Sequence, residues 1–273
     1  LFDAHGVRGT FFVVGEDVDV DRFGGAARSS RTVLEGCVRA GHEIGNHSYS
    51  HPYDLARLSE SEVASEIGRA HELLCELGPR VQGFRAPGYD LSPAMLRELD
   101  RLDYLYDSSV FPAPGYYAAK LAVLGAMRLA GKRSGAVVTN PMALMAPTQP
   151  YRPSLRAPWR RGHARPVELP IAVTPGLRLP AIGTSLLVAP AAVRDRLLEG
   201  ATRDEFFNLE LHGIDLADAD SDGIPGELVA RQPDLRLSIE EKRTRLAEIL
   251  GRLQGAFEFA PLVEVAETMQ SRV

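Results

Sequence analysis

Short apolar runs alternate with amphipathic stretches along this chain, and the alternation favours βα units around a parallel sheet or barrel. The run GTFFVVG at 9–15 is rich in β-branched and aromatic residues and predicts a buried strand. Residues 1–5 read as the end of a helix that leads into it. Later strands are expected over 83–85, 104–108, 167–173, 207–212 and 257–260.

Helices are predicted where apolar side chains recur every three or four residues behind a capping residue. Ser59 and Glu62 have the spacing of a capping box for a helix over 59–77. Ser92 opens a second helix, and Ser238 opens a third near the end of the chain, before a last short helix.

The composition is that of an ordinary globular protein, with 273 residues, 45% hydrophobic, 25% charged, and a formal net charge of -5. We predict a single domain over 1–273 with an insertion at about 112–166. The acidic balance argues against a protein that follows nucleic-acid phosphates. No apolar run reaches the roughly eighteen residues that a membrane-spanning helix needs.

Two histidines four residues apart, His47 and His51 in HSYSH, are candidate metal ligands. On one turn of helix such positions share a face, and neutral imidazole is the commonest protein ligand for zinc and its neighbours. The pair would be half a site, completed by a carboxylate and water. Taken alone, it is more often two histidines at a polar helix start.

Three further polar clusters follow predicted strands: RAPG at 85–88, DSS at 107–109, and His212 in LELHG. Each one alone is more often a turn or a cap. Four in succession, counting the histidine pair, favour an active site at the carboxyl ends of a parallel sheet.

The segments TFFVVG, GHEIGNHSYSHP, FRAPGY, YDSSVFP and LELHGID, in this order, resemble the polysaccharide deacetylases of carbohydrate esterase family 4, the NodB-homology family. The resemblance runs from about Gly6 to Glu267. It implies an α/β fold, a distorted (β/α)7 barrel, and hydrolysis of an N-acyl group from an amino sugar. It also implies a divalent metal, zinc foremost and otherwise cobalt, nickel or manganese, held by two histidines and one aspartate.

The resemblance assigns roles to the strand-end residues. His47 and His51 would bind the metal, His212 would be the general acid, and Asp107 would orient His212. Arg85 would pair with a catalytic aspartate. This division suits the chemistry, because an amide is a poor electrophile and its hydrolysis needs both a polarised carbonyl and a proton for the departing amine.

Pro87, Gly88, Tyr89 and Leu211 complete the expected substrate site. Backbone N–H groups near Gly88 and Tyr89 would receive a developing oxyanion. Leu211 would line an acyl pocket, although a core leucine is about equally expected there.

This sequence departs from the family pattern in two places. Its members carry a pair of aspartates, the general base and the third metal ligand, at the end of a strand upstream of TFFVVG, and this chain starts after that position. We therefore expect an N-terminally truncated chain that lacks the first strand and is inactive or nearly so, although its full-length parent is an enzyme. Val110 and Phe111 stand where many members carry Trp, which leaves substrate choice open.

The segment at about 116–165 is the least explained by the core fold. Residues 116–130 are strongly apolar, and several arginines follow: Arg152, Arg156, Arg160, Arg161 and Arg165. One interpretation is an interfacial helix beside a cationic loop at a membrane surface. The favoured one is an insertion helix on the barrel with a solvated loop.

The acidic run Asp218 to Gly223 has the alternating carboxylates and glycine of a calcium loop. Such a loop also needs a glutamate at its twelfth position, where Val229 stands. A solvated acidic turn is therefore the preferred interpretation.

The sequence thus predicts a metal-dependent hydrolase that removes an N-acyl group, most commonly N-acetyl, from an amino sugar in a polysaccharide or lipid-linked saccharide. The alternatives are a deformylase of a polyprenyl-phosphate-linked amino sugar, an allantoinase-like hydrolase of cyclic amides, and a non-catalytic carbohydrate-binding barrel. The expected partner is an N-acylated glycan or lipid-linked amino sugar, without nucleic acid. The location is left open, because an N-terminal signal region would lie outside this chain, and a cytoplasmic or membrane-associated location is slightly favoured.

Overall fold

The computed structural model describes residues 1–78, 80–118, 121, 125 and 140–271. The chain forms two compact units. Unit 1 comprises Leu1–Val7 and Ile171–Phe259, and unit 2 comprises Arg8–Pro170 and Ala260–Val273. The predicted single domain over 1–273 stays a prediction.

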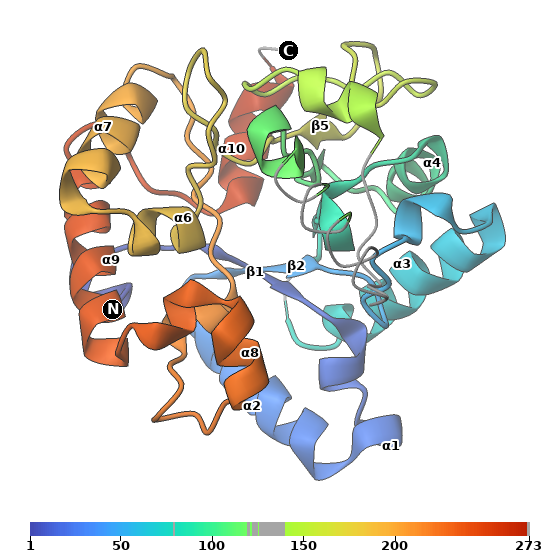
Figure 1. Cartoon of the computed structure of the whole chain (residues 1–273). Coiled ribbons are helices and arrows are strands. Elements are labelled where there is room, and N and C mark those ends of the chain that lie inside the picture. The colour runs from blue at the N-terminus through green and yellow to red at the C-terminus, as the bar shows by residue number, and fades with distance from the viewer. Residues whose placement is uncertain (79, 119–120, 122–124, 126–139, 272–273) are drawn as a thin grey trace. The chain divides into compact units, whose positions relative to one another are not determined.

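Unit 2 is built on a parallel five-stranded sheet (Figure 1). Its strands are β1 Thr10–Val13, β2 Glu43–Asn46, β3 Gly83–Phe84, β4 Tyr106–Asp107 and β5 Val167–Glu168. They lie in chain order, without the reversal that marks a doubly wound sheet. The predicted α/β fold with a parallel sheet is confirmed.

Helices connect and flank these strands. Those of unit 2 are α1 Val20–Phe23, α2 Gly25–Arg39, α3 Glu60–Cys75, α4 Pro93–Arg101 and α10 Leu262–Gln270. Short 3-10 turns lie at Gly15–Val18, Leu55–Arg57, Pro87–Tyr89 and Pro141–Met145. The predicted capping box of α3 is present, because Ser59 and Glu62 each bond the other's backbone N–H.

The two faces of the sheet carry different side chains, because successive residues of a strand point to opposite faces. Phe84 lies on the face that packs against α3 and α4, in one buried apolar cluster. The other face carries Phe12 and Tyr106, whose ring centroids are 6.4 Å apart. Tyr106 lies directly over Gly83, where a Cβ would come within 2.1 Å of the tyrosine ring. A side chain at Gly83 would therefore displace this aromatic layer.

The C-terminal helix α10 belongs to unit 2 and is attached to its first two strands. The N–H of Leu262 donates to Thr10 Oγ1 at 2.9 Å, and that of Val263 donates to Glu43 Oε2 at 3.0 Å. Glu264 forms an exposed ion pair with Arg8 at 2.6 Å. Residues some 250 positions apart in the chain thus meet at one edge of the fold.

Unit 1 consists of helices and connecting segments. Its elements are the 3-10 turns Asp3–His5, Gly213–Leu216 and Pro233–Arg236, and the helices α6 Gly183–Val188, α7 Ala191–Ala201, α8 Gly226–Arg231 and α9 Ile239–Gln254. Its core is an apolar cluster contributed mainly by α6, α7 and α9: Leu186, Leu187, Leu198, Leu246, Ile249, Leu250 and Leu253.

Two of the predicted strands are wrong, and the others are shorter than predicted. The structure assigns no strand over 207–212 or 257–260, and β5 ends at Glu168 instead of reaching 173. The N–H groups of Ala172 and Gly183 donate to carbonyls within 207–212, so that segment bonds two separate stretches rather than one continuous ladder. The alternation of apolar residues predicted a strand, but it could not show that the segment bonds two separate stretches of the chain.

In the part of the chain that the structure describes, no helix is both long and apolar enough to cross a bilayer.

Candidate active site

The two histidines lie side by side directly after β2. Their ring centroids are 4.8 Å apart, and the rings meet edge to face. Because His47 Nδ1 lies 2.6 Å from the carbonyl oxygen of Arg85, Nδ1 carries the proton and Nε2 keeps a lone pair. Metal-binding histidines are commonly oriented in this way. The pair therefore fits half of a metal site, although no group of three His, Cys, Asp or Glu that could hold an ion occurs among the described residues.

The histidine loop, residues 47–51, is not the helical turn that the spacing suggested. It carries no helix, and Ser48 and His51 have φ angles of 65° and 58°. These left-handed conformations bend the loop and bring the two rings together. They cost non-glycine residues on the order of 1 kcal/mol each, which the surrounding contacts must offset. The helix prediction was wrong, but the side chains it was meant to bring together do meet.

Glu66 on α3 holds this loop from the side. Its Oε2 accepts the N–H groups of Tyr49 at 3.1 Å and Ser50 at 2.9 Å, and its Oε1 accepts the Ser50 hydroxyl at 2.8 Å. A carboxylate that accepts several donors of one loop restricts how far the loop can move. Sequence reasoning missed Glu66, because on a helix surface it looks like any other solvated acid.

Asn46, the last residue of β2, also binds the histidine loop. Its Oδ1 accepts the N–H of Ser48 at 2.8 Å, and its Nδ2 donates to Ile67 O at 3.0 Å and to Tyr104 Oη at 2.9 Å. The amide is fully buried, and each of its polar atoms has a partner. The left-handed turn at Ser48 is thus tied to the core.

A third contact reaches the middle of the loop. The Tyr49 hydroxyl donates to Asp19 Oδ2 at 2.8 Å, and this hydrogen bond is the main reason that the pKa of the Asp19 carboxyl lies below its usual value. Arg69 donates to the same oxygen and lies over the Tyr49 ring, 3.8 Å from its centroid. The loop is therefore held by three separate carboxyl or amide side chains.

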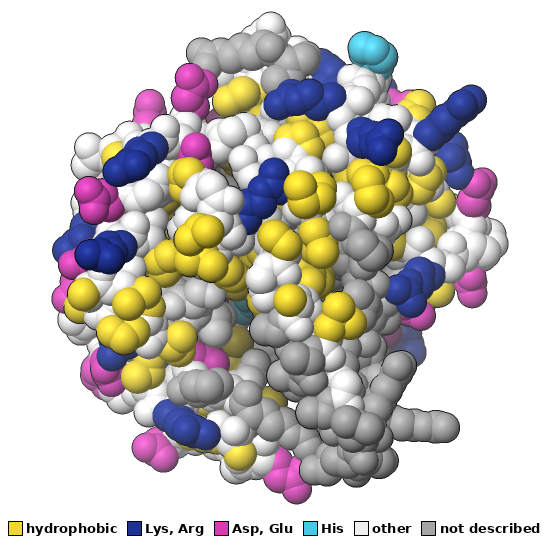
Figure 2. All heavy atoms as spheres, turned by 45° about the horizontal axis from the view of Figure 1, so that its top comes forward, with side chains coloured by type: hydrophobic (Ala, Val, Ile, Leu, Met, Phe, Trp, Pro, Cys, Tyr) yellow, Lys and Arg dark blue, Asp and Glu magenta, His cyan; other side chains and the backbone are white. Residues whose placement is uncertain are grey.

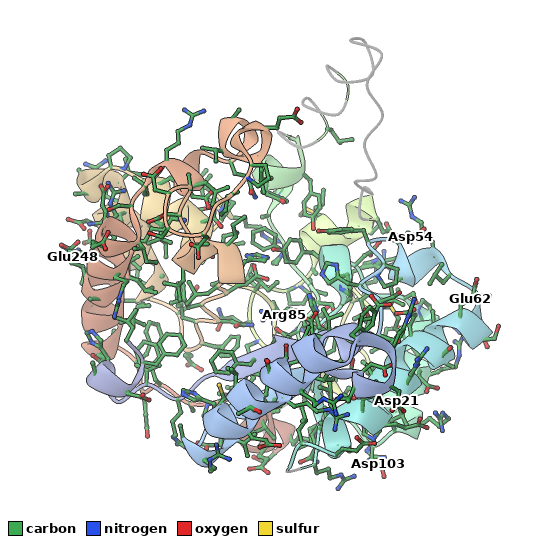
Figure 3. The ribbon with its side chains drawn as sticks, turned by 90° about the horizontal axis from the view of Figure 1, so that it is seen from below. Asp21, Asp54, Glu62, Arg85, Asp103 and Glu248 are labelled. Atoms are coloured by element: carbon green, nitrogen blue, oxygen red, sulfur yellow. The ribbon has the colours of Figure 1, made fainter. Side chains whose placement is uncertain are left out.

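Arg85 directly follows β3 and shares the sheet face of Phe12. Its Nε donates to Ser108 O at 3.0 Å, its Nη2 donates to Ser108 Oγ at 2.7 Å, and its guanidinium lies 4.4 Å from the Phe12 ring centroid. Figure 3 shows Arg85 inside unit 2, whereas the labelled acids Asp54 and Glu62 lie at its edge. Arg85 is a buried cation at the carboxyl end of the sheet, as predicted from its position.

Asp107, predicted to orient a general acid, is fully buried at the end of β4. It is in register with Phe84 of β3 and with Glu168 of β5, so it lies on the sheet face opposite to that of Arg85. Its carboxyl group accepts the Ser109 hydroxyl at 2.7 Å. The adjacent Glu168 is a buried acid that the sequence analysis did not identify, and the only signal was a glutamate within the apolar run PVELPIAV.

The predicted substrate-binding residues at 87–89 form a tight turn. Gly88 has φ 79° and Tyr89 has φ 62°. A Cβ at Gly88 would lie 2.8 Å from the carbonyl oxygen of Tyr53, so this turn packs directly on the segment that follows the histidine loop. Pro87 is buried at its start.

Tyr53 itself stands beside the histidine pair. Its ring centroid is 5.0 Å from that of His51, with the rings perpendicular, and 57% of the residue is exposed. An exposed aromatic ring next to candidate ligands offers an apolar surface to a substrate. Neither its spacing nor its composition singled it out in the sequence.

His212 lies in unit 1, so its predicted interaction with Asp107 of unit 2 stays a prediction. Its backbone N–H donates to Asp215 Oδ2 at 2.9 Å, and its ring nitrogens lie 3.9 Å from carboxylate oxygens of Glu210 and Asp215. The ring is about half exposed, whereas both carboxylates are buried. Leu211 packs against the apolar cluster of unit 1, as expected of a core leucine. Within unit 1, His212 therefore lies beside two carboxylates, those of Glu210 and Asp215.

The segment at 116–165 is only partly described. The predicted apolar helix over 116–130 lies mostly outside the described residues. In the following loop, Trp159 packs on the core cluster, while Leu155 is 47% exposed. The arginines at 156, 160, 161 and 165 are exposed, and Figure 2 shows Lys and Arg side chains interspersed with hydrophobic ones on the face it presents. The predicted membrane contact stays a prediction.

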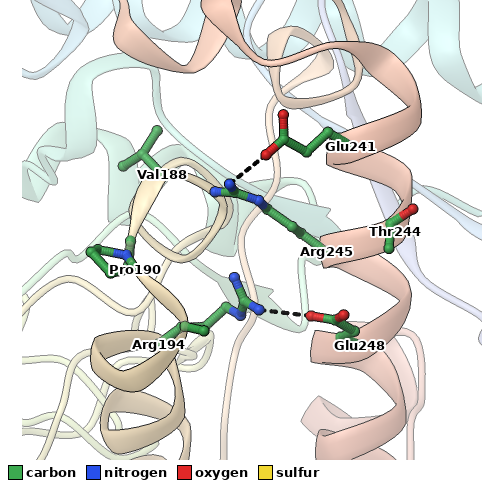
Figure 4. A pocket seen from close by; sticks show the side chains of 9 residues that line it. Val188, Pro190, Arg194, Glu241, Thr244, Arg245 and Glu248 are labelled. Atoms are coloured by element: carbon green, nitrogen blue, oxygen red, sulfur yellow. Dashed lines mark hydrogen bonds and ion pairs between the residues drawn. The ribbon is translucent and has the colours of Figure 1, made fainter.

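A surface hollow of about 540 Å³ lies within unit 1, between α7 and α9 (Figure 4). Its charged side chains are already paired, Arg194 with Glu248 at 2.7 Å and Arg245 with Glu241 at 2.5 Å. It contains none of the predicted site residues, so we do not treat it as the active site.

The fold and these strand-end residues define an α/β protein with a candidate hydrolytic site on a parallel sheet. A Mycobacterium smegmatis structure described as a polysaccharide deacetylase has a similar fold, with a TM-score of 0.52 and 19% identity over 99% of this chain and 74% of that one. Residues 1–106 match the family model for polysaccharide deacetylase. The match over residues 1–106, together with the fold, supports a domain of the polysaccharide deacetylase family, carbohydrate esterase family 4.

Two relatives named as deacetylases are similar to shorter parts of the chain. A peptidoglycan-N-acetylglucosamine deacetylase of Bacillus cereus is 34% identical over 85 residues, which is 31% of this chain. A chitin deacetylase of Arthroderma benhamiae is 29% identical over 106 residues, which is 38% of this chain. Each match covers 27% of the relative's own length. These matches support the family over part of the chain, whereas activity and substrate are matters for proposal.

Proposed function

We propose that this chain is part of a metal-dependent hydrolase that removes an N-acyl group from an amino sugar in a glycan or lipid-linked saccharide. The observation that carries the proposal is the histidine pair: two imidazoles 4.8 Å apart, one of them oriented through Nδ1 by the Arg85 carbonyl. Its family supports the reaction class, since relatives are named as deacetylases of peptidoglycan and chitin.

His47 and His51 are the proposed ligands. A divalent metal there, zinc foremost, would polarise the acyl carbonyl and acidify a water molecule. The chain's own residues would do the rest. Glu66 and Asn46 keep the two imidazoles in place, Arg85 supplies a fixed positive charge, and His212 would give a proton to the departing amine.

A glycan is the proposed substrate class. Sugar rings present flat C–H faces, and the exposed Tyr53 ring beside His51 offers an apolar surface of matching shape. The strands, which follow one another in chain order, also support the finer fold expectation of a NodB-type (β/α)7 barrel.

The test is binding and hydrolysis of N-acetylated chito-oligosaccharide by the metal-loaded chain, with cello-oligosaccharide as the matched control lacking the acyl group. We expect at least about tenfold tighter binding of the N-acetylated ligand. Acetate release should be slow, should need added metal, and should stop with a chelator. Equal binding of the two oligosaccharides, or release that a chelator does not affect, would overturn the proposal.

Removing the Glu66 carboxylate should weaken metal binding without removing a ligand. Glu66→Ala leaves two backbone N–H groups and a hydroxyl of the histidine loop without their acceptor. Outer contacts of this kind are typically worth about 10- to 100-fold in metal affinity, and we expect a loss of about tenfold. Competitive zinc titration measures it.

Glu72→Ala is the matched control, because Glu72 is exposed on the same helix, six residues further on. Glu66→Gln should fall between Glu66→Ala and the native chain, since one amide oxygen can still accept. Equal zinc affinities for Glu66→Ala and Glu72→Ala would show that the carboxylate does not position the loop.

A further inference from the structure

We propose that Glu168 is a positioning residue of the candidate site. It shares one proton with Asp107. Asp107 in turn bonds Ser109, which holds the backbone next to Arg85. Nothing in the sequence pattern assigned Glu168 a role. The site that it serves is the one proposed above, so the inference rests on that assignment, but its tests need neither metal nor substrate.

Burial and pairing point to a shared proton. Glu168 and Asp107 are the last residues of neighbouring strands, in register, and both are 0% exposed. Glu168 Oε1 accepts the N–H of Val110 at 2.9 Å, but Glu168 Oε2 is buried with no hydrogen-bond partner among the described residues. Two ionised carboxylates in this setting would repel each other and leave that oxygen unsatisfied. A proton on Oε2 removes both costs by donating toward Asp107.

The surrounding charges agree with this arrangement. Burial, and after it the charge of Asp107, raises the pKa of Glu168 well above its usual value. Arg85, which follows β3, lowers the pKa of both acids. Tyr151, which pairs with the backbone of Glu168, donates its hydroxyl to Pro158 O at 2.8 Å and so does not supply the missing donor.

A chain of hydrogen bonds connects the acid pair to the site. The Ser109 hydroxyl donates to Asp107 Oδ1 at 2.7 Å, and the same hydroxyl oxygen accepts the N–H of Ala86 at 2.8 Å. Ala86 follows Arg85, whose carbonyl orients His47. The acid pair therefore fixes the piece of backbone on which the histidine orientation depends.

The first test is the pH dependence of unfolding in Glu168→Gln, whose amide is a neutral isostere of the protonated acid. A raised pKa in the folded state gives stability that is present below the unfolded pKa and is lost as pH rises toward the folded one. As pH rises above about 5, the native chain should therefore lose stability relative to Glu168→Gln. Glu98→Gln, a buried acid paired with Arg101 on α4, is the control and should behave like the native chain.

The second test is hydrogen exchange at the Ala86 amide. We expect exchange to be at least about tenfold faster in Glu168→Ala and close to native in Glu168→Gln near pH 6. The Gln variant carries the test even where the Ala variant does not fold. The inference is overturned if Glu168→Gln and the native chain show the same pH dependence, or if Ala86 exchange in Glu168→Gln is as fast as in an unfolded segment.

Discussion

Replacing both His47 and His51 by alanine is expected to abolish stoichiometric metal binding by this chain. The two imidazoles are the candidate ligands that the structure brings together, and the described residues offer no group of three that could substitute for them. Loss of both should lower affinity by more than about 100-fold, beyond the effect typical of an outer contact. Plasma mass spectrometry on the dialysed protein and a cobalt titration followed by visible absorption would measure it.

His163→Ala is the matched control, because His163 is an exposed histidine of unit 2 that lies in the arginine-containing loop. It should bind metal like the native chain. A double variant that keeps its metal would place the ion elsewhere. A native chain that binds none would show that two histidines do not suffice, and the proposed role of the pair as a metal site in this chain would fail.

Replacing Lys242 by alanine is expected to destabilise unit 1 by about 3–5 kcal/mol. Lys242 on α9 is fully buried, and its Nζ donates to the carbonyl oxygens of Ile214 at 3.0 Å and Ala217 at 2.5 Å. It also lies 3.6 Å from Asp234 Oδ2, an ion pair too long for a hydrogen bond. Truncation would leave a buried carboxylate and two carbonyl oxygens without their cation.

Chemical denaturation would measure the effect, and hydrogen exchange over 212–217 would locate it, because this segment contains the two carbonyl groups that Lys242 bonds. Arg243→Ala, an exposed cation one residue further along α9, should change stability by less than about 0.5 kcal/mol. Removing the pair together, in Lys242→Met with Asp234→Leu, should recover much of the loss. A Lys242→Ala chain as stable as the control would contradict this account.

The sequence was informative where chemistry depends on strand ends. The run at 9–15, the capping box at Ser59 and the placement of Arg85 after a strand all follow from local pattern, and all are present. The sequence correctly predicted that His47 and His51 lie together, but it assumed the wrong backbone conformation. Spacing suggested a helical turn, whereas Ser48 and His51 adopt left-handed conformations that Asn46 and Glu66 stabilise.

Longer-range features could not be predicted from one sequence. Glu168 gains its importance from register with Asp107, a residue 61 positions earlier in the chain. Likewise, Glu66 matters because its helix packs against the histidine loop. Segment 207–212 has a strand's alternation but bonds two separate stretches, which no local pattern reveals. Tertiary partners, rather than propensity, decided each of these cases.

The attachment of α10 to the first strands of unit 2 has a consequence for biosynthesis. A ribosome releases the chain from its N-terminus, so Thr10 and Glu43 emerge long before the backbone N–H groups of Leu262 and Val263 that bond to them. Until those residues emerge, the early strands lack one of their contacts, and closing so long a loop is slow. Completion of this unit therefore waits for residues that are made about 250 positions after the strand they bond to.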